Sequence, residues 1–130
     1  MCQLFINADV KNWENKTRSL RIDGVITSIR LEQFFWNVLE EIAACDEMTV
    51  NQLITRLYHE SLDADHDIGN FTSFLRVCCG RFLSLAADGE LKRNEKLSLG
   101  SLNVEEIFQR EKSAQLHRKT RVAAVNSNKH

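Results

Sequence analysis

The sequence lacks the features that identify a membrane or secreted protein. No apolar run approaches the roughly 20 residues that a membrane-spanning helix needs. The N-terminus has neither the charged region nor the apolar region of a signal peptide. We therefore expect a cytoplasmic protein, nucleoid-associated if it binds DNA, that makes no membrane contact.

Cysteine pairs and catalytic motifs are also missing. The four cysteines form no CxxC pair and no spaced framework, so we expect reduced structural cysteines. The adjacent Cys78 and Cys79 would diverge by about a quarter turn on a helix and rarely chelate together, so no metal site is predicted. There is no glycine-rich phosphate loop, nucleophile elbow or spaced acid pair, and we predict no enzyme activity and no cofactor.

The sequence also lacks an excess of basic over acidic residues. The formal net charge is -1, which argues against indiscriminate nucleic-acid binding, because an excess of Lys and Arg normally drives it. The charges are unevenly distributed: residues 11–30 contain five basic and two acidic residues, and residues 90–130 contain nine basic and five acidic. The stretch between these two segments is acidic. This polarity is expected where one face of a protein meets phosphates.

The sequence does contain a short strand pattern followed directly by a helix pattern. A strand over residues 25–31 would bury its odd-numbered row, from Val25 to Leu31, and expose Ile26, Ser28 and Arg30. One isolated strand in a helical domain has no backbone partner within the chain. We therefore expect it to pair antiparallel with the same strand of a second copy, forming a homodimer whose two-stranded ribbon fits the DNA major groove.

A second alternating pattern precedes this strand, in the opposite parity. Leu20 and Ile22 lie on even positions, so the parity switches at Asp23-Gly24. The switch requires a bulge or a tight turn, and glycine tolerates the backbone angles of both. A register slip of one residue would turn Thr27 outward and invert the assignment of the exposed row.

Three helices are predicted after the strand. The first, over residues 32–45, has apolar residues at helical spacing, but Phe34 and Trp36 lie outside that row and could cover the dimer partner or the third helix. The second begins at Thr49, because Thr49-Val-Asn-Gln52 matches a capping box. The third covers about residues 70–88.

The two ends of the chain have weaker patterns. Residues 1–9 suggest an extra strand or a strap, and residues 10–17 suggest an exposed connection. Residues 103–121 could form a further helix, and residues 126–130 are expected to be disordered.

The stretch RLEQFFWNVLEEIAACDEMTVNQLITRLYHE resembles the ribbon-helix-helix (MetJ/Arc-like) superfamily of bacterial and phage repressors. RSLRIDGVITSIRLEQFFW and GNFTSFLRVCC are similar to a bacterial subfamily with an added third helix. The resemblance covers residues 18–85. It implies a mainly α fold with one short β-strand, a dimer with an intermolecular two-stranded antiparallel ribbon, and a DNA-binding transcription regulator of the repressor type.

The resemblance also implies which residues read the bases. Ile26, Ser28 and Arg30 fall where the family places its base-reading side chains. Arg30 can bind guanine O6 and N7 as a fork, Ser28 can donate or accept a hydrogen bond, and Ile26 can contact a thymine methyl group.

Phosphate contacts are implied at two further places. The family anchors a phosphate at the N-terminus of its second helix, which here corresponds to the amides of Thr49, Val50 and Asn51, at the positive end of the helix dipole. Arg18 and Arg21 could bind flanking phosphates.

These expectations divide the chain into an N-terminal arm (residues 1–17), a ribbon-helix-helix domain with a third helix (residues 18–89) and a basic, partly disordered tail (residues 90–130).

A second hypothesis is a protein-interaction or antitoxin-like module in which the tail, or the face that carries Trp36, binds a partner protein. The sparse apolar positions of the tail motivate it.

Overall fold

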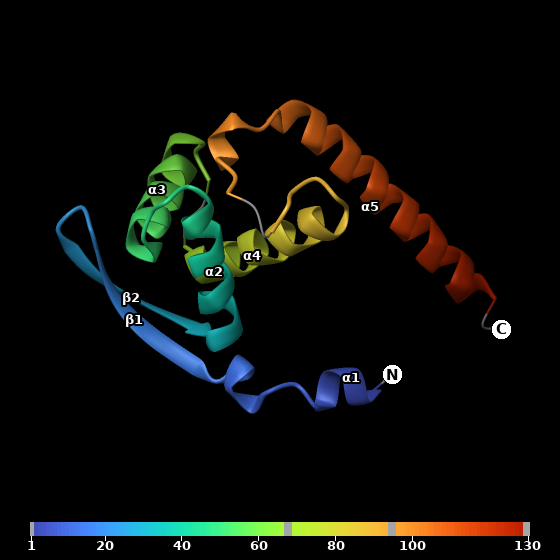
Figure 1. The fold of residues 1–130 in the computed structure, drawn as a ribbon, viewed down its shortest axis with the longest axis horizontal. Helices are drawn as coiled ribbons and strands as arrows, with labels where there is room; N and C mark the ends of the chain where they lie inside the picture. Colours follow the sequence, from blue (N-terminus) through green and yellow to red (C-terminus); the bar gives the residue numbers. More distant parts are fainter. Residues whose placement is uncertain (1, 67–68, 94–95, 129–130) are drawn as a thin grey trace.

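The fold is built on a β-hairpin that lies against three helices (Figure 1). The computed structural model describes residues 2–66, 69–93 and 96–128. The hairpin and the helices are β1 (Asn15–Ile22), β2 (Val25–Glu32), α2 (Gln33–Cys45), α3 (Val50–Asp63) and α4 (Phe71–Ala87). The flanking elements are α1 (Cys2–Ile6), the 3₁₀ helix η1 (Val10–Trp13), the 3₁₀ helix η2 (Leu99–Ser101) and α5 (Val104–Ser127).

A two-residue turn at Asp23-Gly24 closes the hairpin. Asp23 has φ 52° and Gly24 has φ 81°, and positive φ at both central residues defines the type I′ turn, whose twist matches that of paired strands. The antiparallel register starts at the pair Ile22 and Val25 and ends at the pair Asn15 and Glu32. The parity switch at Asp23-Gly24 is therefore a tight turn, as the sequence requires.

The prediction that the domain has only one short strand is wrong. β1 is a second strand, and it pairs with β2 within the same chain. The two-stranded ribbon is thus intramolecular, and β2 does not need a second copy to satisfy the edge that faces β1. The order of ribbon, helix, helix and third helix is confirmed.

The inner face of the hairpin is apolar and forms one wall of the core. Leu20 and Ile22 of β1 and Ile29 and Leu31 of β2 are buried. The fully buried side chains that complete the core are Leu31, Trp36, Leu39, Ile54, Leu75 and Cys79. These residues of the inner face therefore pack the hairpin against α2, α3 and α4.

The predicted buried row of β2 is confirmed only in its second half. Val25 is 64% exposed and Thr27 is also exposed, although both lie on the inner face. Their partners on β1, Ile22 and Leu20, are buried, so near the tip the helices cover the β1 side of the inner face and leave the β2 side open (Figure 1).

The helices begin close to their predicted positions. The capping box at the start of α3 is complete: Gln52 N–H donates to Thr49 Oγ1 at 3.2 Å, and Thr49 N–H donates to Gln52 Oε1 at 2.9 Å. Asn70 precedes α4 and Asp88 follows it, in agreement with the predicted third helix.

Trp36 belongs to the core of its own chain. Its side chain is fully buried, and Nε1 donates to the backbone oxygen of Lys16 at 2.9 Å. The prediction that the face carrying Trp36 docks a partner protein is therefore wrong. Phe34, the other residue outside the helical row, remains 41% exposed.

An ion pair and a hydrogen bond join the Trp36 contact in fixing the hairpin. At its base, Arg76 of α4 donates to both carboxylate oxygens of Glu32, at 3.0 and 2.9 Å. At its tip, His59 Nε2 of α3 lies 2.9 Å from the carboxylate of Asp23. The orientation of the hairpin is thus determined at both of its ends.

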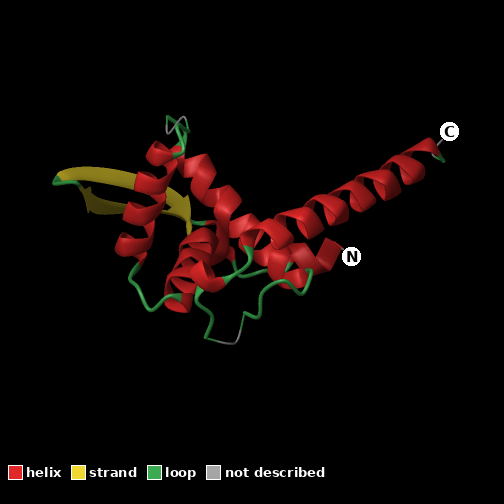
Figure 2. Ribbon diagram, turned by 90° about the horizontal axis from the view of Figure 1, so that it is seen from above, coloured by secondary structure: helices red, strands yellow, loops and turns green. Residues whose placement is uncertain are grey.

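The two ends of the chain differ from expectation. The first nine residues contain the short helix α1 instead of a strand, and β1 begins at Asn15, within the expected connection. Helix α5 continues through residues 126 and 127, where disorder is predicted; residues 129–130 lie outside the described part of the chain. Ile107 packs the start of α5 on the body, ion pairs of Glu111 and Arg118 continue the contact, and the C-terminal turns project away (Figure 2). No helix among the described residues is both long and apolar enough to span a membrane.

Candidate nucleic-acid interface

The outer face of the hairpin is polar and exposed. Opposed residues of an antiparallel pair point to the same side of a sheet, so the register determines which side chains share this face. Three exposed pairs form it: Arg21 with Ile26, Ser19 with Ser28, and Thr17 with Arg30. The structure therefore brings the three predicted base-reading residues together and adds three side chains of β1.

The arginines of this face have no carboxylate partner. Neither Arg21 nor Arg30 forms an ion pair within the described residues, and the one carboxylate of the outer row, that of Glu32, is occupied by Arg76. By contrast, five arginines of the body and of α5 are ion-paired: Arg76, Arg81, Arg93, Arg110 and Arg118. Two guanidinium groups are thus available to an external anion on the outer face.

Arg18 lies on the opposite face and does not join Arg21. It is paired with Ile29 across the sheet, its Nη2 lies 2.9 Å from Glu40 Oε1, and its guanidinium carbon lies 4.6 Å from the Trp36 ring centroid. Its charge is therefore shared with a carboxylate and with an aromatic face. The local role of Arg18 is to hold β1 on α2.

The N-terminus of α3 offers fewer free amides than predicted. Val50 and Asn51 lie in the first turn, where N–H groups have no acceptor within the helix. The amide of Thr49 is not free, because it donates to the Gln52 side chain in the capping box. The same interaction that determines the start of α3 removes one of the three predicted anion contacts.

A hollow of about 470 Å³ lies beside this helix end. It is lined by Arg18, Glu40, Ala43, Met48, Thr49, Val50 and Asn51. Arg18 and the positive end of the helix dipole favour an anion there, whereas the carboxylate of Glu40 opposes one. The balance of these charges determines how strongly the hollow attracts phosphate.

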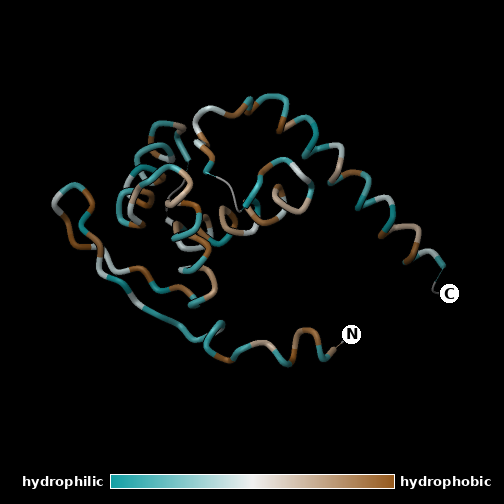
Figure 3. Tube along the Cα trace, viewed as in Figure 1, coloured by the Kyte–Doolittle hydropathy of each residue, from teal (hydrophilic) through white to brown (hydrophobic). Residues whose placement is uncertain are grey.

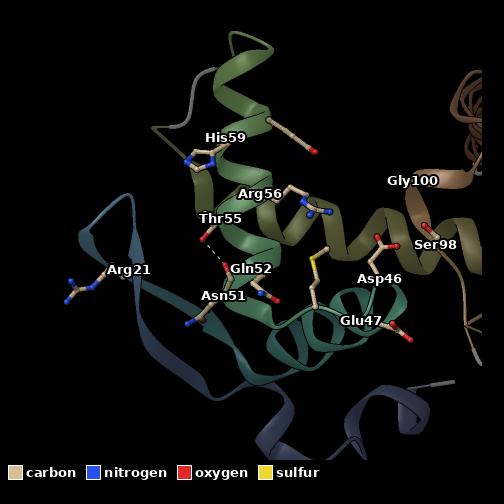
Figure 4. A pocket seen from close by; sticks show the side chains of 12 residues that line it. Arg21, Asp46, Glu47, Asn51, Gln52, Thr55, Arg56, His59, Ser98 and Gly100 are labelled. Atoms are coloured by element: carbon tan, nitrogen blue, oxygen red, sulfur yellow. Dashed lines mark hydrogen bonds between the residues drawn. The ribbon is translucent and has the colours of Figure 1, made fainter.

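A larger open groove of about 900 Å³ follows the exposed side of α3 (Figure 4). Arg21 lines one end and Ser98 and Gly100 the other. Its charges are mixed, with Arg56 and Glu60 both contributing, and no group of His, Cys, Asp and Glu in the described residues is arranged to hold a metal ion. The groove leaves the exposed side of α3 accessible next to the hairpin.

The cysteines of α4 have no nucleophilic character. Burial raises the pKa of Cys78 to about 11 and that of Cys79 to about 12, so both remain protonated thiols near neutral pH. Cys79 donates to the backbone oxygen of Phe35 at 3.6 Å. Both residues contribute to packing.

The outer residues of β1 could have been found from the sequence. An Asp-Gly dipeptide between two alternating patterns is a strong hairpin signal. With a two-residue turn at Asp23-Gly24, the register places Thr17, Ser19 and Arg21 opposite the base-reading row. Arg21 would then be recognised as a neighbour of Ile26 on the outer face.

Comparisons with known proteins agree with this arrangement. Residues 15–83 match the model of a family described as a ribbon-helix-helix domain. The structure is similar to that of an uncharacterized protein from Bordetella pertussis Tohama I, with a TM-score of 0.78 and 48% sequence identity, covering 82% of this chain and 86% of that one. No curated protein matches the sequence.

Proposed function

Because the chain belongs to the ribbon-helix-helix domain family, we propose that it is a sequence-specific transcriptional repressor that places the outer face of its hairpin in the DNA major groove. Proteins with this domain are typically DNA-binding transcription regulators. The observation that carries the proposal is the exposed row of Ile26, Ser28 and Arg30, in which Arg30 has no ion-pair partner among the described residues.

The chemistry of this row suits base edges. Arg30 can donate two parallel hydrogen bonds to guanine O6 and N7, Ser28 can donate or accept, and Ile26 can pack on a thymine methyl group. Arg21, opposite Ile26, is placed to bind a phosphate at the wall of the groove. The amides of Val50 and Asn51 would bind a second phosphate, with Arg18 beside them.

A homodimer is part of the proposal, although its basis differs from the one expected from sequence. The turn pairs Ile22 with Val25, so the backbone groups of Ile26, Ser28 and Arg30 point away from β1, toward an edge that no described strand occupies. A second β2 paired antiparallel at this edge would give a four-stranded sheet with two-fold symmetry. It would also bring the exposed Val25 of one copy near the exposed Phe34 of the other.

The test begins with selection of bound duplexes from a random DNA pool, together with the mass of the protein in solution. We expect one enriched sequence with two-fold symmetry and a mass of about 30 kDa, twice that of the 15.0 kDa chain. Arg30→Ala should weaken binding to that sequence by about 1 to 3 kcal/mol and relax the preference at one base position of each half-site.

Arg93→Ala is the matched control. Arg93 is ion-paired with Glu41 on the helical body, away from the hairpin, so its loss should leave affinity and base preference unchanged. A monomer with no enriched sequence, or an Arg30→Ala protein with the affinity and base preference of the wild type, would refute the proposal.

One observation favours a second candidate function, a protein-interaction or antitoxin-like module. The last helix, α5, exposes Val104, Phe108, Leu116, Val122 and Val125. Removal of residues 112–130 tests this candidate and retains the buried Leu91 and Ile107, which a deletion from residue 90 would remove from the core. If the shortened chain loses a co-purifying protein and binds DNA as before, the module is supported. If the same proteins co-purify with the full-length and the shortened chain, the result counts against it.

A further inference from the structure

The C-terminal end of the chain carries a charge opposite to that of the rest. Through Glu111 the sequence has 12 basic and 18 acidic residues, and after Glu111 it has five basic and no acidic residues. Helix α5 therefore passes from a mixed first half into a segment that contains only positive formal charges. We call residues 112–128 the basic arm.

The charges in the first half of α5 are used within the fold. Arg81 Nη2 lies 2.7 Å from Glu111 Oε1, and Arg110 Nε lies 2.7 Å from Glu90 Oε1. One charge of the basic arm is also used within the fold, because Arg118 forms an ion pair with Asp88. These contacts fix the direction in which α5 leaves the body.

The remaining charges of the basic arm are free. Lys112, Lys119 and Arg121 are exposed and have no acidic partner in the part of the chain that the structure describes. No carboxylate of the arm can supply one, since the arm contains no Asp or Glu.

The apolar residues of the arm do not form a stripe. Leu116, Val122 and Val125 are all more than half exposed. At about 100° per residue, Leu116 lies roughly 240° around the helix from Val122, so the two are on different sides. Figure 3 shows polar and apolar positions alternating along the projecting helix. A helix that binds an apolar groove or lies in a lipid interface needs one continuous apolar side.

The geometry of the arm is that of a rod. At 1.5 Å per residue, residues 112–128 extend for about 25 Å, the length of roughly seven base pairs. Arg118 reaches back to Asp88 at the end of α4, and Figures 1 and 2 show the later turns of α5 extending away from the body. Lys112, Lys119 and Arg121 are therefore accessible, and at about 100° per residue Arg121 lies on the opposite side of the helix from Lys112.

We propose that the basic arm binds DNA phosphates outside the site read by the hairpin, without regard to sequence. This inference rests on the proposed function, because it assigns the arm to the same duplex. A body with an excess of acidic residues repels DNA, and the arm supplies the positive charge that offsets this repulsion. A helix with charge on several sides and no apolar stripe fits a phosphate backbone better than a protein groove.

The test uses the full chain and a variant in which Lys112, Lys119 and Arg121 are replaced by Gln. A control variant carries Lys92→Gln, Arg93→Gln and Lys96→Gln, which removes the same number of exposed charges from the helical body, outside both the arm and the basic segment of the hairpin. Both proteins have a formal net charge of -4, three lower than the -1 of the wild type. Binding is measured against salt on two duplexes, the selected site alone and the same site with about 15 flanking base pairs on each side.

We expect the arm variant to lose about tenfold or more in affinity for the long duplex in 0.1 M salt, and its slope of log K against log salt to fall by about two to three. Its affinity for the short duplex and its base preference should match those of the wild type. The control variant should bind the long duplex within about twofold of the wild type, since it removes charge but no arm contact.

Three results would overturn the inference: an equal loss on both duplexes, an equal loss in the control variant, or an unchanged salt slope. Binding to vesicles of phosphatidylserine and phosphatidylcholine is measured in parallel. If the arm variant loses vesicle binding and keeps DNA binding, the arm is a lipid contact and the inference fails.

The inference can be separated from the proposed function. If the wild type selects no sequence, the repressor proposal fails, and the arm is then tested on a random duplex of about 40 base pairs. A loss of binding in the arm variant alone supports the arm as a phosphate contact, and equal binding of the wild type and both variants overturns it.

Discussion

The two faces of the hairpin have different chemistry although they alternate residue by residue. On the inner face, Leu20, Ile22, Ile29 and Leu31 are buried in the core. The outer face is exposed along both strands, at Thr17, Ser19, Arg21, Ile26, Ser28 and Arg30. Because strand side chains point alternately to opposite sides, one row stabilises the fold and the other remains available for recognition. Substitutions on the two faces should therefore affect different properties.

The largest expected effect is on stability, from the inner face. Leu31 is fully buried, so Leu31→Ala should lower the free energy of unfolding by about 2 to 5 kcal/mol through lost contacts and a residual cavity. Ser28→Ala, on the exposed outer face, should change it by less than about 0.5 kcal/mol. Denaturant unfolding of both variants measures the difference. A similar loss in the two would show that the outer face is also buried, for example by a second copy.

The next largest expected effect is on DNA affinity, and it depends on the different ion pairing of Arg18 and Arg21. Arg18 is ion-paired with Glu40 beside the N-terminus of α3, whereas Arg21 has no acidic partner among the described residues. Glu40→Gln should therefore make Arg18 available and strengthen DNA binding by about 0.5 to 1 kcal/mol, a few-fold in affinity.

The control for this change is Glu41→Gln. Glu41 is the next residue of α2 but is paired with Arg93, so its neutralisation should alter DNA affinity less than that of Glu40. Equal gains would indicate a general effect of net charge, and weaker binding by Glu40→Gln would mean that the hollow beside α3 does not hold a phosphate.

The smallest effect is a pH dependence at the base of the hairpin. The two hydrogen bonds from Arg76 lower the pKa of Glu32 below its usual 4.5. The stabilisation is therefore present above pH 4.5 and is lost as the pH falls through the lowered pKa of the folded state. The Arg76 side chain is 37% exposed, so the contribution is about 1 kcal/mol or less.

Arg76→Gln tests this dependence. The variant should be slightly less stable than the wild type at pH 7, and the difference should shrink as the pH approaches about 3. Unfolding free energies across this range measure it. A difference that stays constant with pH would assign the effect to packing of the Arg76 side chain.

Local patterns predicted much of the fold. The capping box at Thr49 determined the start of α3, and helical spacing identified α2 and α4, because each signal depends on residues within one or two turns. The parity of β2 correctly placed Ile26, Ser28 and Arg30 on an exposed face. These features require no knowledge of distant contacts.

Non-local contacts account for what was missed. The ion pair of Arg18 joins residues 22 positions apart, and the one between Arg76 and Glu32 joins residues 44 apart, so neither follows from periodicity. The exposure of Val25, opposite the buried Ile22, depends on which side of the hairpin the helices cover, and the alternating pattern of a strand contains no information about that. The intramolecular pairing of β1 was the exception, because the Asp23-Gly24 turn that produces it is a local signal.

The sequence by itself determined which residues share a face, where α3 begins and that the chain ends in a segment with only basic charges, because alternation, capping and charge order are properties of neighbouring residues. Only the tertiary structure decided which arginines are neutralised by carboxylates, that the core encloses Trp36 and which side of the hairpin the helices cover. These depend on groups that lie far apart in the chain and meet only when the hairpin packs on the helices.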